Sequence, residues 1–191
     1  MNKQRIINDQ YFTASEVTRL LLDKVDIKGV VFEPCAGEGH IAAQFPNRCF
    51  TNDIDTNLRK HDGVYHDYFL DATKEQSWEQ LTYSNRIDWV ITNPPFNKAF
   101  DILQHSWNNC TTGVAFLLRL SFLEPTKKRG QWLEDNADQM FKIIPVNPRV
   151  RFRQDTNGSD SVTVAWFIWR KDFSWDNYGC GCPFDFIREW R

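Results

Sequence analysis

Short apolar runs alternate with helical patterns along most of this chain, and this alternation restricts the fold more than any other feature. A continuous apolar run suits a parallel strand that helices cover on both faces. The expected strands are 29–32, 49–53, 87–92, 113–118, 141–146 and 161–169, and the expected helices are 14–25, 40–45, 99–107 and 125–136. The pattern predicts a doubly wound α/β sheet, with a binding crevice outside the carboxyl ends of its central strands.

Composition and charge restrict the class of protein. With 41% hydrophobic and 15% aromatic residues, the chain is too apolar for a disordered protein, and its 191 residues suit one compact domain. We expect a single domain over 1–191, with a core over 11–170 and a tail over 171–191. The 23 basic and 25 acidic residues exclude a strongly basic nucleic-acid coat protein, so any contact with nucleic acid must come from a local patch.

The chain lacks the features of secreted and membrane proteins. It contains no apolar run of about 18 residues, and residues 1–8 lack the apolar segment of a secretory signal. The five cysteines are odd in number and scattered, which is not the pattern of a disulfide framework. We therefore expect a cytoplasmic protein without membrane association.

A glycine-containing turn follows the run at 29–32. It begins with Glu33-Pro34-Cys35 and continues through Gly37 and Gly39, whose lack of a side chain lets the backbone turn sharply near a ligand. The glycine spacing satisfies a dinucleotide-binding pattern that is by itself weakly specific, and an ordinary structural turn is the alternative. A carboxylate at a strand end repels phosphate and suits an ammonium group, so Glu33 favours a ligand with an amino-acid-like end over a dinucleotide.

The expected strand 49–53 ends in Asp53 and is followed by Ile54. A carboxylate at this point is well placed to accept hydrogen bonds from ribose hydroxyls, and Ile54 offers an apolar wall for an adenine ring. A capped turn explains Asp55 better than a binding role does. Together, the two loops predict a pocket for an adenosine with an amino-acid-like tail.

Asn93-Pro94-Pro95-Phe96 follows the run at 87–92 and is the most informative tetrad in the chain. Its prolines fix φ, remove two backbone donors and restrict the preceding residues to extended conformations. The rigid loop presents carbonyl oxygens, to which Asn93 adds an amide oxygen and Phe96 a flat apolar face. This set suits a planar ring with an exocyclic amino group. The two oxygens can accept both amino hydrogens, and the ring can stack on Phe96, a contact worth about 1–3 kcal/mol. The alternative of an ordinary Asn-Pro turn is disfavoured by the position at a strand end.

These segments, with Tyr11-Phe12-Thr13 before them, resemble the S-adenosylmethionine-dependent N6-adenine DNA methyltransferases, in the small form found in phages and prophages. The motifs occur in the family's order, and the resemblance extends to 116–124 and 165–169. It implies a class I, Rossmann-like methyltransferase domain with a mostly parallel, seven-stranded sheet and no separate target-recognition domain. It also implies S-adenosylmethionine as cofactor, S-adenosylhomocysteine as product, and adenine N6 as the methyl acceptor.

The resemblance also implies a role for individual residues. Tyr11 and Thr13 would hold the methionine end of the cofactor, although Ala14 stands where the family has proline. Glu33 and the backbone of Gly37 and Gly39 would line that end. The other cofactor-binding residues would be Pro34, Cys35, Asp53 at the ribose, Ile54, and Asp67 at the adenine amino group with Asp71 as its alternative. Asn93, Pro94, Pro95 and Phe96 would form the catalytic loop.

Candidate contacts with nucleic-acid phosphates lie in a locally basic part of the chain. They are Lys127, Lys128 and Arg129, for which a solvated helix end is an equal alternative, and Arg149, Arg151 and Arg153, which are the stronger candidates. With few basic contacts, binding should be modest and sensitive to salt. We expect no metal site, because the histidines lack ligand spacing and Cys180-Gly181-Cys182 has no second cysteine pair.

Three other functions stay open. The tetrad also serves RNA N6-adenine methyltransferases, and a protein-glutamine N5-methyltransferase needs the same pair of acceptors, although Phe96 suits a nucleobase better than that family's usual tyrosine. A non-catalytic nucleic-acid-binding partner subunit is the third alternative, against which the intact tetrad argues. DNA is the favoured partner over RNA, and a homodimer or a partner subunit could contribute to target recognition.

Overall fold

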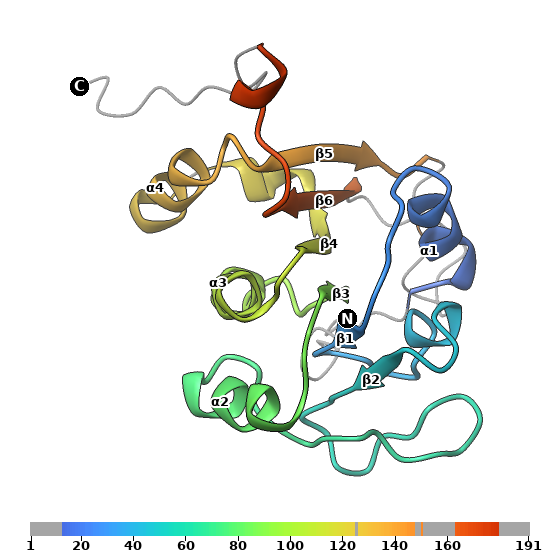
Figure 1. Cartoon of the computed structure of the whole chain (residues 1–191). Helices are drawn as coiled ribbons and strands as arrows, with labels where there is room; N and C mark the ends of the chain where they lie inside the picture. Colours follow the sequence, from blue (N-terminus) through green and yellow to red (C-terminus); the bar gives the residue numbers. More distant parts are fainter. Residues whose placement is uncertain (1–12, 125, 148–149, 151–162, 180–191) are drawn as a thin grey trace, which may run out of the picture.

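The sheet is mixed and has six strands in the part of the chain that the computed structural model describes, which is residues 13–124, 126–147, 150 and 163–179. The strands are β1 (Val31–Glu33), β2 (Cys49–Thr51), β3 (Trp89–Thr92), β4 (Gly113–Arg119), β5 (Met140–Pro145) and β6 (Val164–Arg170). Their order in space is β2-β1-β3-β4-β6-β5 (Figure 1). Neighbours from β2 to β4 pair in parallel, whereas β6 is antiparallel to both β4 and β5.

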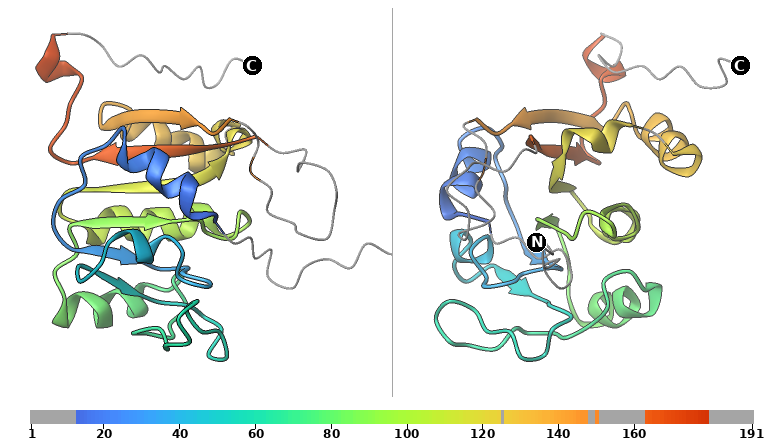
Figure 2. Two further views of the ribbon diagram at one scale, coloured as in Figure 1. Left: turned by 90° about the vertical axis from the view of Figure 1, so that its right-hand side faces the viewer. Right: turned by 180° about the vertical axis from the view of Figure 1, so that it is seen from behind.

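Helices cover both faces of the sheet. They are α1 (Ser15–Leu22), α2 (Glu75–Ser84), α3 (Ala99–Asn109) and α4 (Lys127–Asp135), with short 3-10 turns η2 (Ala42–Gln44), η3 (Leu120–Leu123) and η4 (Asp176–Tyr178). Figures 1 and 2 place α2, α3 and α4 on one face and α1 on the other. This arrangement confirms the expected α/β fold class. None of the described helices combines the length and apolar character that crossing a membrane requires.

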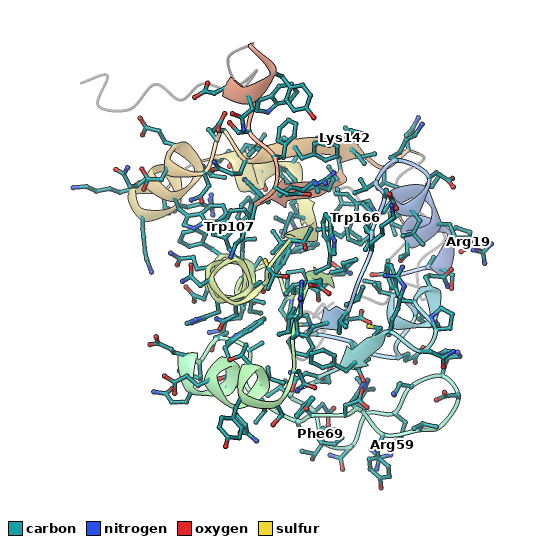
Figure 3. All side chains as sticks on the ribbon, in the orientation of Figure 1. Arg19, Arg59, Phe69, Trp107, Lys142 and Trp166 are labelled. Atoms are coloured by element: carbon teal, nitrogen blue, oxygen red, sulfur yellow. The ribbon has the colours of Figure 1, made fainter. Side chains whose placement is uncertain are left out.

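Two apolar clusters form the core, one on each face. Trp78, Leu103 and Leu133 belong to the cluster under α2, α3 and α4, and each is completely or almost completely buried. Val17 and Leu21 of α1 belong to the other cluster. On that second face, Trp166 points from β6 toward α1 (Figure 3) and donates from Nε1 to the carbonyl of Val17 at 3.0 Å. The inner strands β1, β3, β4 and β6 are buried on both faces, so their apolar runs are continuous, whereas the edge strands β2 and β5 are only partly buried.

Each of the six runs identified in the sequence overlaps a strand, but the seventh strand implied by the resemblance is not confirmed in the described residues. Residues 53–72 run along the edge of the sheet beside β2 and form only an isolated parallel bridge, between Asn52 and Tyr68. The carboxylates of Asp55 and Asp62 in this segment each accept a backbone N–H two residues further on, at 2.9 and 3.0 Å. Such local turns compete with a strand, and the apolar run in the segment, 68–70, is only three residues long.

The helix α2 is not expected from the sequence. Only Trp78 and Leu81 are large buried apolar residues within it, and the rest of its sequence is mainly polar. Trp78 anchors the helix because its Nε1 donates to the carbonyl of Ala72 at 2.9 Å. The expected helix at 40–45, in contrast, is reduced to the single 3-10 turn η2. In both segments tertiary contacts, rather than a periodic pattern, decide the local structure.

Asp88, just before β3, joins the amino ends of the strands. Its two carboxylate oxygens accept hydrogen bonds from the Val30 N–H at 2.8 Å, the Arg86 Nε at 2.8 Å and the Thr111 hydroxyl at 2.7 Å. Gly29 is required opposite this carboxylate, because it has φ +85° and a Cβ there would lie 2.2 Å from Oδ2. Burial acts to raise the pKa of Asp88, but these hydrogen bonds outweigh it and hold the pKa below its ordinary value of 3.8.

We expect Asp88→Asn to lower the free energy of unfolding by about 2 kcal/mol near neutral pH, because an amide cannot accept all three hydrogen bonds. A carboxylate whose pKa is lower in the folded state stabilises the fold above its unfolded pKa and loses this effect as pH falls through the folded pKa. The difference from the wild type should therefore shrink below about pH 4. Urea unfolding at several pH values measures it, with the exposed Asp26→Asn as control. An equal difference at all pH values would contradict the prediction.

Candidate cofactor pocket and reactive loop

A cavity of about 280 Å³ lies at the carboxyl ends of β1, β2 and β3. It is bordered by the loops that follow these strands, which is where a doubly wound sheet places its ligands. The predicted site residues that line it are Pro34, Cys35, Gly37, Asp53, Ile54, Asp71, Asn93, Pro94 and Pro95. Loops that are far apart in the sequence therefore meet at one cavity.

A smaller hollow of about 20 Å³ adjoins this cavity on the side of the glycine loop. Thr13 and Glu33 line it, and neither borders the larger cavity. Cys35, Gly37 and Asn93 border both spaces, so the two adjoin along these residues. Asn93, from the reactive tetrad, thus lies at the junction of the two spaces.

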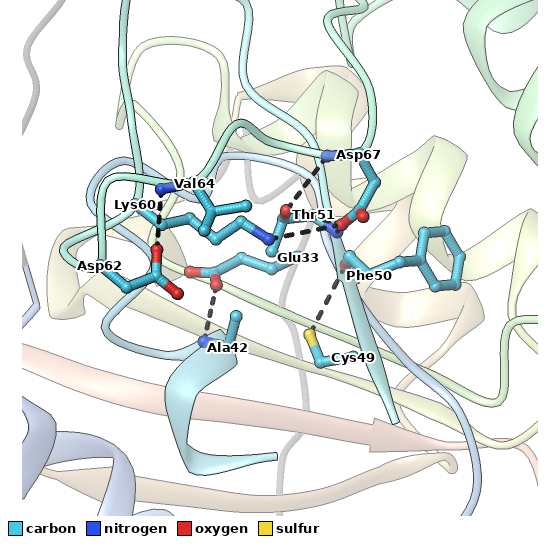
Figure 4. A network of polar contacts seen from close by, with 9 residues as sticks. All are labelled: Glu33, Ala42, Cys49, Phe50, Thr51, Lys60, Asp62, Val64 and Asp67. Carbon is cyan, nitrogen blue, oxygen red and sulfur yellow. Dashed lines mark hydrogen bonds and ion pairs between the residues drawn. The ribbon is translucent and has the colours of Figure 1, made fainter. Parts of the chain in front are cut away.

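Glu33 is a buried carboxylate at the end of β1, with 1% of its surface exposed. One of its oxygens accepts the N–H of Ala42 at 2.8 Å (Figure 4). Burial raises the pKa of Glu33 well above its ordinary value, the Ala42 hydrogen bond opposes this, and the nearby negative charge of Asp53 adds to it. No described residue forms an ion pair with Glu33. A cationic ligand group would therefore gain a strong interaction here.

The glycine loop is held against Asp53 by its backbone. Gly37 and Gly39 have φ values of +56° and +75°, in the left-handed region that favours glycine. The Gly37 N–H donates to one oxygen of Asp53 at 2.9 Å, and the N–H of Asp55 donates to the other at 3.0 Å. Burial raises the pKa of the Cys35 thiol in this loop, so the thiol stays protonated. The loop thus offers a shaped backbone and a carboxylate rather than a reactive nucleophile.

Asn52 has no role predicted from the sequence, yet it joins three loops of the site. Its buried side-chain amide donates to the carbonyls of Pro34 at 2.9 Å and Leu70 at 3.0 Å, and its oxygen accepts the Leu70 N–H at 2.7 Å. The loops after β1 and β2 and the segment that carries Asp71 are thereby held together. The sequence signal was a polar residue inside an otherwise buried strand end, where an amide must find partners.

The structure separates the two candidates for the adenine amino contact. Asp67 lies beside β2, where it accepts the Thr51 N–H and hydroxyl at 2.8 Å each and lies 3.9 Å from the Lys60 Nζ (Figure 4). It borders neither the cavity nor the smaller hollow. Asp71 does border the cavity, and it accepts both the N–H and the hydroxyl of Thr73, at 2.9 and 2.7 Å.

Two lysines at helix starts lie beside Asp71. Lys74 caps α2 and Lys98 caps α3, and both line the cavity. Burial acts to raise the pKa of Asp71, but the hydrogen bonds from Thr73 and the charges of these two lysines lower it below its ordinary value. Asp71 is therefore ionised at neutral pH and can accept hydrogen bonds from a ligand.

The tetrad leads from the end of β3 into α3. The Pro95 carbonyl accepts the N–H of Lys98 at 2.8 Å, which turns the chain into α3. No described residue donates to the Pro94 carbonyl. Phe96 is half-buried, lies outside the lining of both hollows, and has the Arg119 guanidinium over its ring, 4.4 Å from the ring centroid. Asn93 and Pro94 therefore border the cavity, whereas the ring of Phe96 lies outside it, against Arg119.

The predicted phosphate contacts are only partly described. Lys127 and Lys128 are exposed in the first turn of α4, and the Lys128 Nζ lies 5.7 Å from the centroid of the Phe100 ring. Arg129 donates to the Glu124 carbonyl and lies over Phe122, so it contributes to holding its own segment. Tyr11, Arg149, Arg151, Arg153, Cys180 and Cys182 lie outside the described residues. Within the described residues, no group of three His, Cys, Asp or Glu side chains could hold a metal ion.

Comparison with known proteins identifies the fold. No family model and no curated protein matches the chain. Among solved structures, it is similar to the type I restriction-modification methyltransferase subunit from Streptococcus thermophilus, at 14% identity and a TM-score of 0.61, over 86% of this chain and 46% of that one. The type I restriction enzyme EcoKI M protein matches at 16% identity and a TM-score of 0.63, over 84% of this chain and 44% of that one.

A third structure, M. capricolum TrmK in complex with S-adenosylhomocysteine, matches at 8% identity and a TM-score of 0.54, over 90% of this chain and 71% of that one. The chain thus spans less than half the length of the two restriction-modification proteins. At these identities the likeness shows the fold alone, and this chain has the Rossmann-like α/β fold found in methyltransferases. The phage-type form of the family stays a prediction.

We expect Asn52→Ala to lower the free energy of unfolding by about 2–4 kcal/mol, because it removes three buried hydrogen bonds and leaves backbone groups without partners. Urea unfolding measures the effect. Asn57→Ala, an identical change at an exposed position of the loop after β2, is the matched control. Equal stability of the two variants would show that Asn52 does not hold the loops together.

Proposed function

We propose that this protein is an S-adenosylmethionine-dependent methyltransferase that transfers a methyl group to the exocyclic N6 amino group of adenine in DNA. One observation carries the proposal: Asn93 of the Asn-Pro-Pro-Phe loop borders both parts of the acid-lined pocket. If the two spaces hold the methionine end and the adenosine end of the cofactor, its sulfonium methyl group would lie at this junction, beside Asn93, where the acceptor must approach it. The similarity of the fold to methyltransferases, one of them in complex with S-adenosylhomocysteine, supports the same reading.

The residues around the pocket suit this cofactor. The buried carboxylate of Glu33, together with Thr13 and the glycine loop, would hold the methionine end in the smaller hollow. Asp53 would accept the ribose hydroxyls and Ile54 would cover the adenine. Because Asp71 borders the cavity and Asp67 does not, we assign the adenine amino contact to Asp71. S-adenosylmethionine supplies an electrophilic methyl group when it is bound.

The tetrad would activate the acceptor nitrogen. The side-chain oxygen of Asn93 and the carbonyl of Pro94 would accept the two amino hydrogens of the target adenine. No described residue donates to the Pro94 carbonyl. These hydrogen bonds favour the pyramidal nitrogen of the transition state, whose lone pair is withdrawn from the ring. Positioning of the two reactants supplies much of the remaining rate enhancement. The amine becomes acidic once it is methylated, so no tuned general base is required.

DNA is the proposed polymer, and the acceptor would be flipped out of a duplex to reach the tetrad. The exposed Lys127 and Lys128 suit a phosphate backbone, and two of the similar structures are described as restriction-modification proteins. Target recognition by a second copy or a partner subunit is part of this proposal. Tritiated-methyl transfer to duplex DNA, single-stranded DNA, RNA and protein separates the proposal from its alternatives.

We expect Asn93→Ala to reduce methyl transfer to DNA by about 100- to 1000-fold, because one of the two acceptors for the amino group is lost. The dissociation constant for S-adenosylmethionine, measured by calorimetry, should change only a few-fold. Asn108→Ala, at an exposed position of α3 away from the cavity, is the matched control. Near-normal turnover by Asn93→Ala would end the proposal.

Glu33 should make cofactor affinity depend on pH. The pKa of Glu33 is raised in the free protein, and only the carboxylate form attracts the ammonium group. Affinity for S-adenosylmethionine should therefore increase as pH rises above 4.5 through the raised pKa, and then level off.

Glu33→Gln tests this account. The variant keeps an oxygen acceptor for the Ala42 N–H but has no charge, so its affinity should be at least about tenfold lower at high pH and independent of pH. The same variant should unfold at a higher temperature than the wild type above the raised pKa, because the buried charge that opposes folding is gone. A pH-dependent affinity that persists in Glu33→Gln would assign the titration to another group.

A further inference from the structure

Arg119 occupies the place on Phe96 where an acceptor base is expected. It is the last residue of β4, the strand next to β3, so its side chain lies beside the tetrad at the carboxyl edge of the sheet. Its guanidinium carbon lies 4.4 Å from the centroid of the Phe96 ring. A planar cation over an aromatic face is a favourable arrangement, and it covers the surface that a nucleobase would use for stacking.

The polar groups of Arg119 are incompletely satisfied in this arrangement. Among the described residues, its buried Nε has no hydrogen-bond partner and no carboxylate forms an ion pair with it. A buried N–H of a cation without an acceptor is costly, since such groups are normally paired. Arg170, in contrast, forms two hydrogen bonds with Asp172, at 2.9 and 2.6 Å. Arg119 therefore carries, beside the Asn-Pro-Pro-Phe loop, a positive charge and an Nε–H donor that no described residue pairs with.

We propose that the target base replaces the Arg119 guanidinium on the Phe96 ring, and that the displaced guanidinium then binds the backbone phosphate next to the flipped nucleotide. An arginine binds phosphate through two parallel N–H groups, so its unpartnered Nε gains an acceptor. The exchange keeps Phe96 covered at every stage and makes the site complementary to an anionic polymer. A glutamine side chain of a protein offers neither an aromatic ring nor a phosphate for this exchange.

This inference rests on the proposed function, because it takes the methyl acceptor to be a base in a nucleic acid. Its test uses the full-length protein, S-adenosylhomocysteine and a short fluorescein-labelled DNA duplex, with binding measured by anisotropy over a range of NaCl concentrations. Arg119→Ala should weaken binding and reduce the slope of log affinity against log salt by about one, since one phosphate contact is lost. In steady-state assays, the KM for DNA should rise about tenfold, as for one charge-assisted hydrogen bond, with a smaller change in kcat.

Two further variants separate this role from a structural one. Arg119→Lys should restore the salt slope, because it keeps the positive charge. It should not restore the full affinity, because an ammonium group cannot form the bidentate hydrogen bonds that a guanidinium forms with phosphate. Arg48→Ala is the matched control: Arg48 lies 4.9 Å over the Phe45 ring, just before β2 at the opposite edge of the sheet, and its loss should leave the slope unchanged. An unchanged slope and KM in Arg119→Ala, or an equal loss in Arg48→Ala, would overturn the proposal.

The outcome also distinguishes this inference from the proposed function. If the wild type transfers methyl groups to DNA but Arg119→Ala has the same salt slope and KM as the wild type, the proposed function stands and the role of Arg119 is rejected. A salt slope that depends on Arg119, without methyl transfer to any nucleic acid, would support the phosphate contact and reject the function. A wild-type protein that binds no nucleic acid would overturn both.

Discussion

The side-chain amide of Asn52 is the interaction on which the candidate site depends. Its three hydrogen bonds join the loop that begins at Pro34 to the segment around Leu70, directly beside Asp53. Parallel strands bring these loops to one edge of the sheet, but strands alone leave the loop conformations free. A buried amide must use its hydrogen-bonding capacity, so it selects one arrangement of the loops. Glu33, Asp53 and Asp71 are then held around one pocket.

Charge is divided between the inside and the outside of this site. Carboxylates line the pocket, and burial keeps the pKa of Glu33 raised until a cationic group approaches. Cations lie at its exposed border and beyond it: Lys74 and Lys98 border the cavity, Arg119 lies over Phe96, and Lys127 and Lys128 lie at the start of α4. An acid-lined interior suits a cationic cofactor, and a cationic surround suits an anionic polymer. The near-neutral total charge of the chain therefore conceals two opposite local environments.

Much of the fold and of the site could be predicted, because the signals were local. Apolar runs indicated six strands, and the glycine loop, Asp53 and the tetrad each follow a strand, so their meeting at one edge follows from parallel topology. The seventh strand was implied only by resemblance, and the segment 53–72 beside β2 forms turns and one isolated bridge instead. The helix α2 has too few apolar residues to show a period, and it depends on Trp78 and its contact with Ala72.

The sequence by itself determined the order of the elements and which residue types follow each strand, because hydrophobic period and turn chemistry act over a few neighbouring residues. Only the tertiary structure showed that Asp71 borders the cavity, whereas Asp67 accepts hydrogen bonds from Thr51 beside β2. It also placed Arg119 on Phe96 and gave Asn52 its role. These outcomes depend on contacts between distant segments, which burial and the pairing of polar groups establish only when the chain is folded.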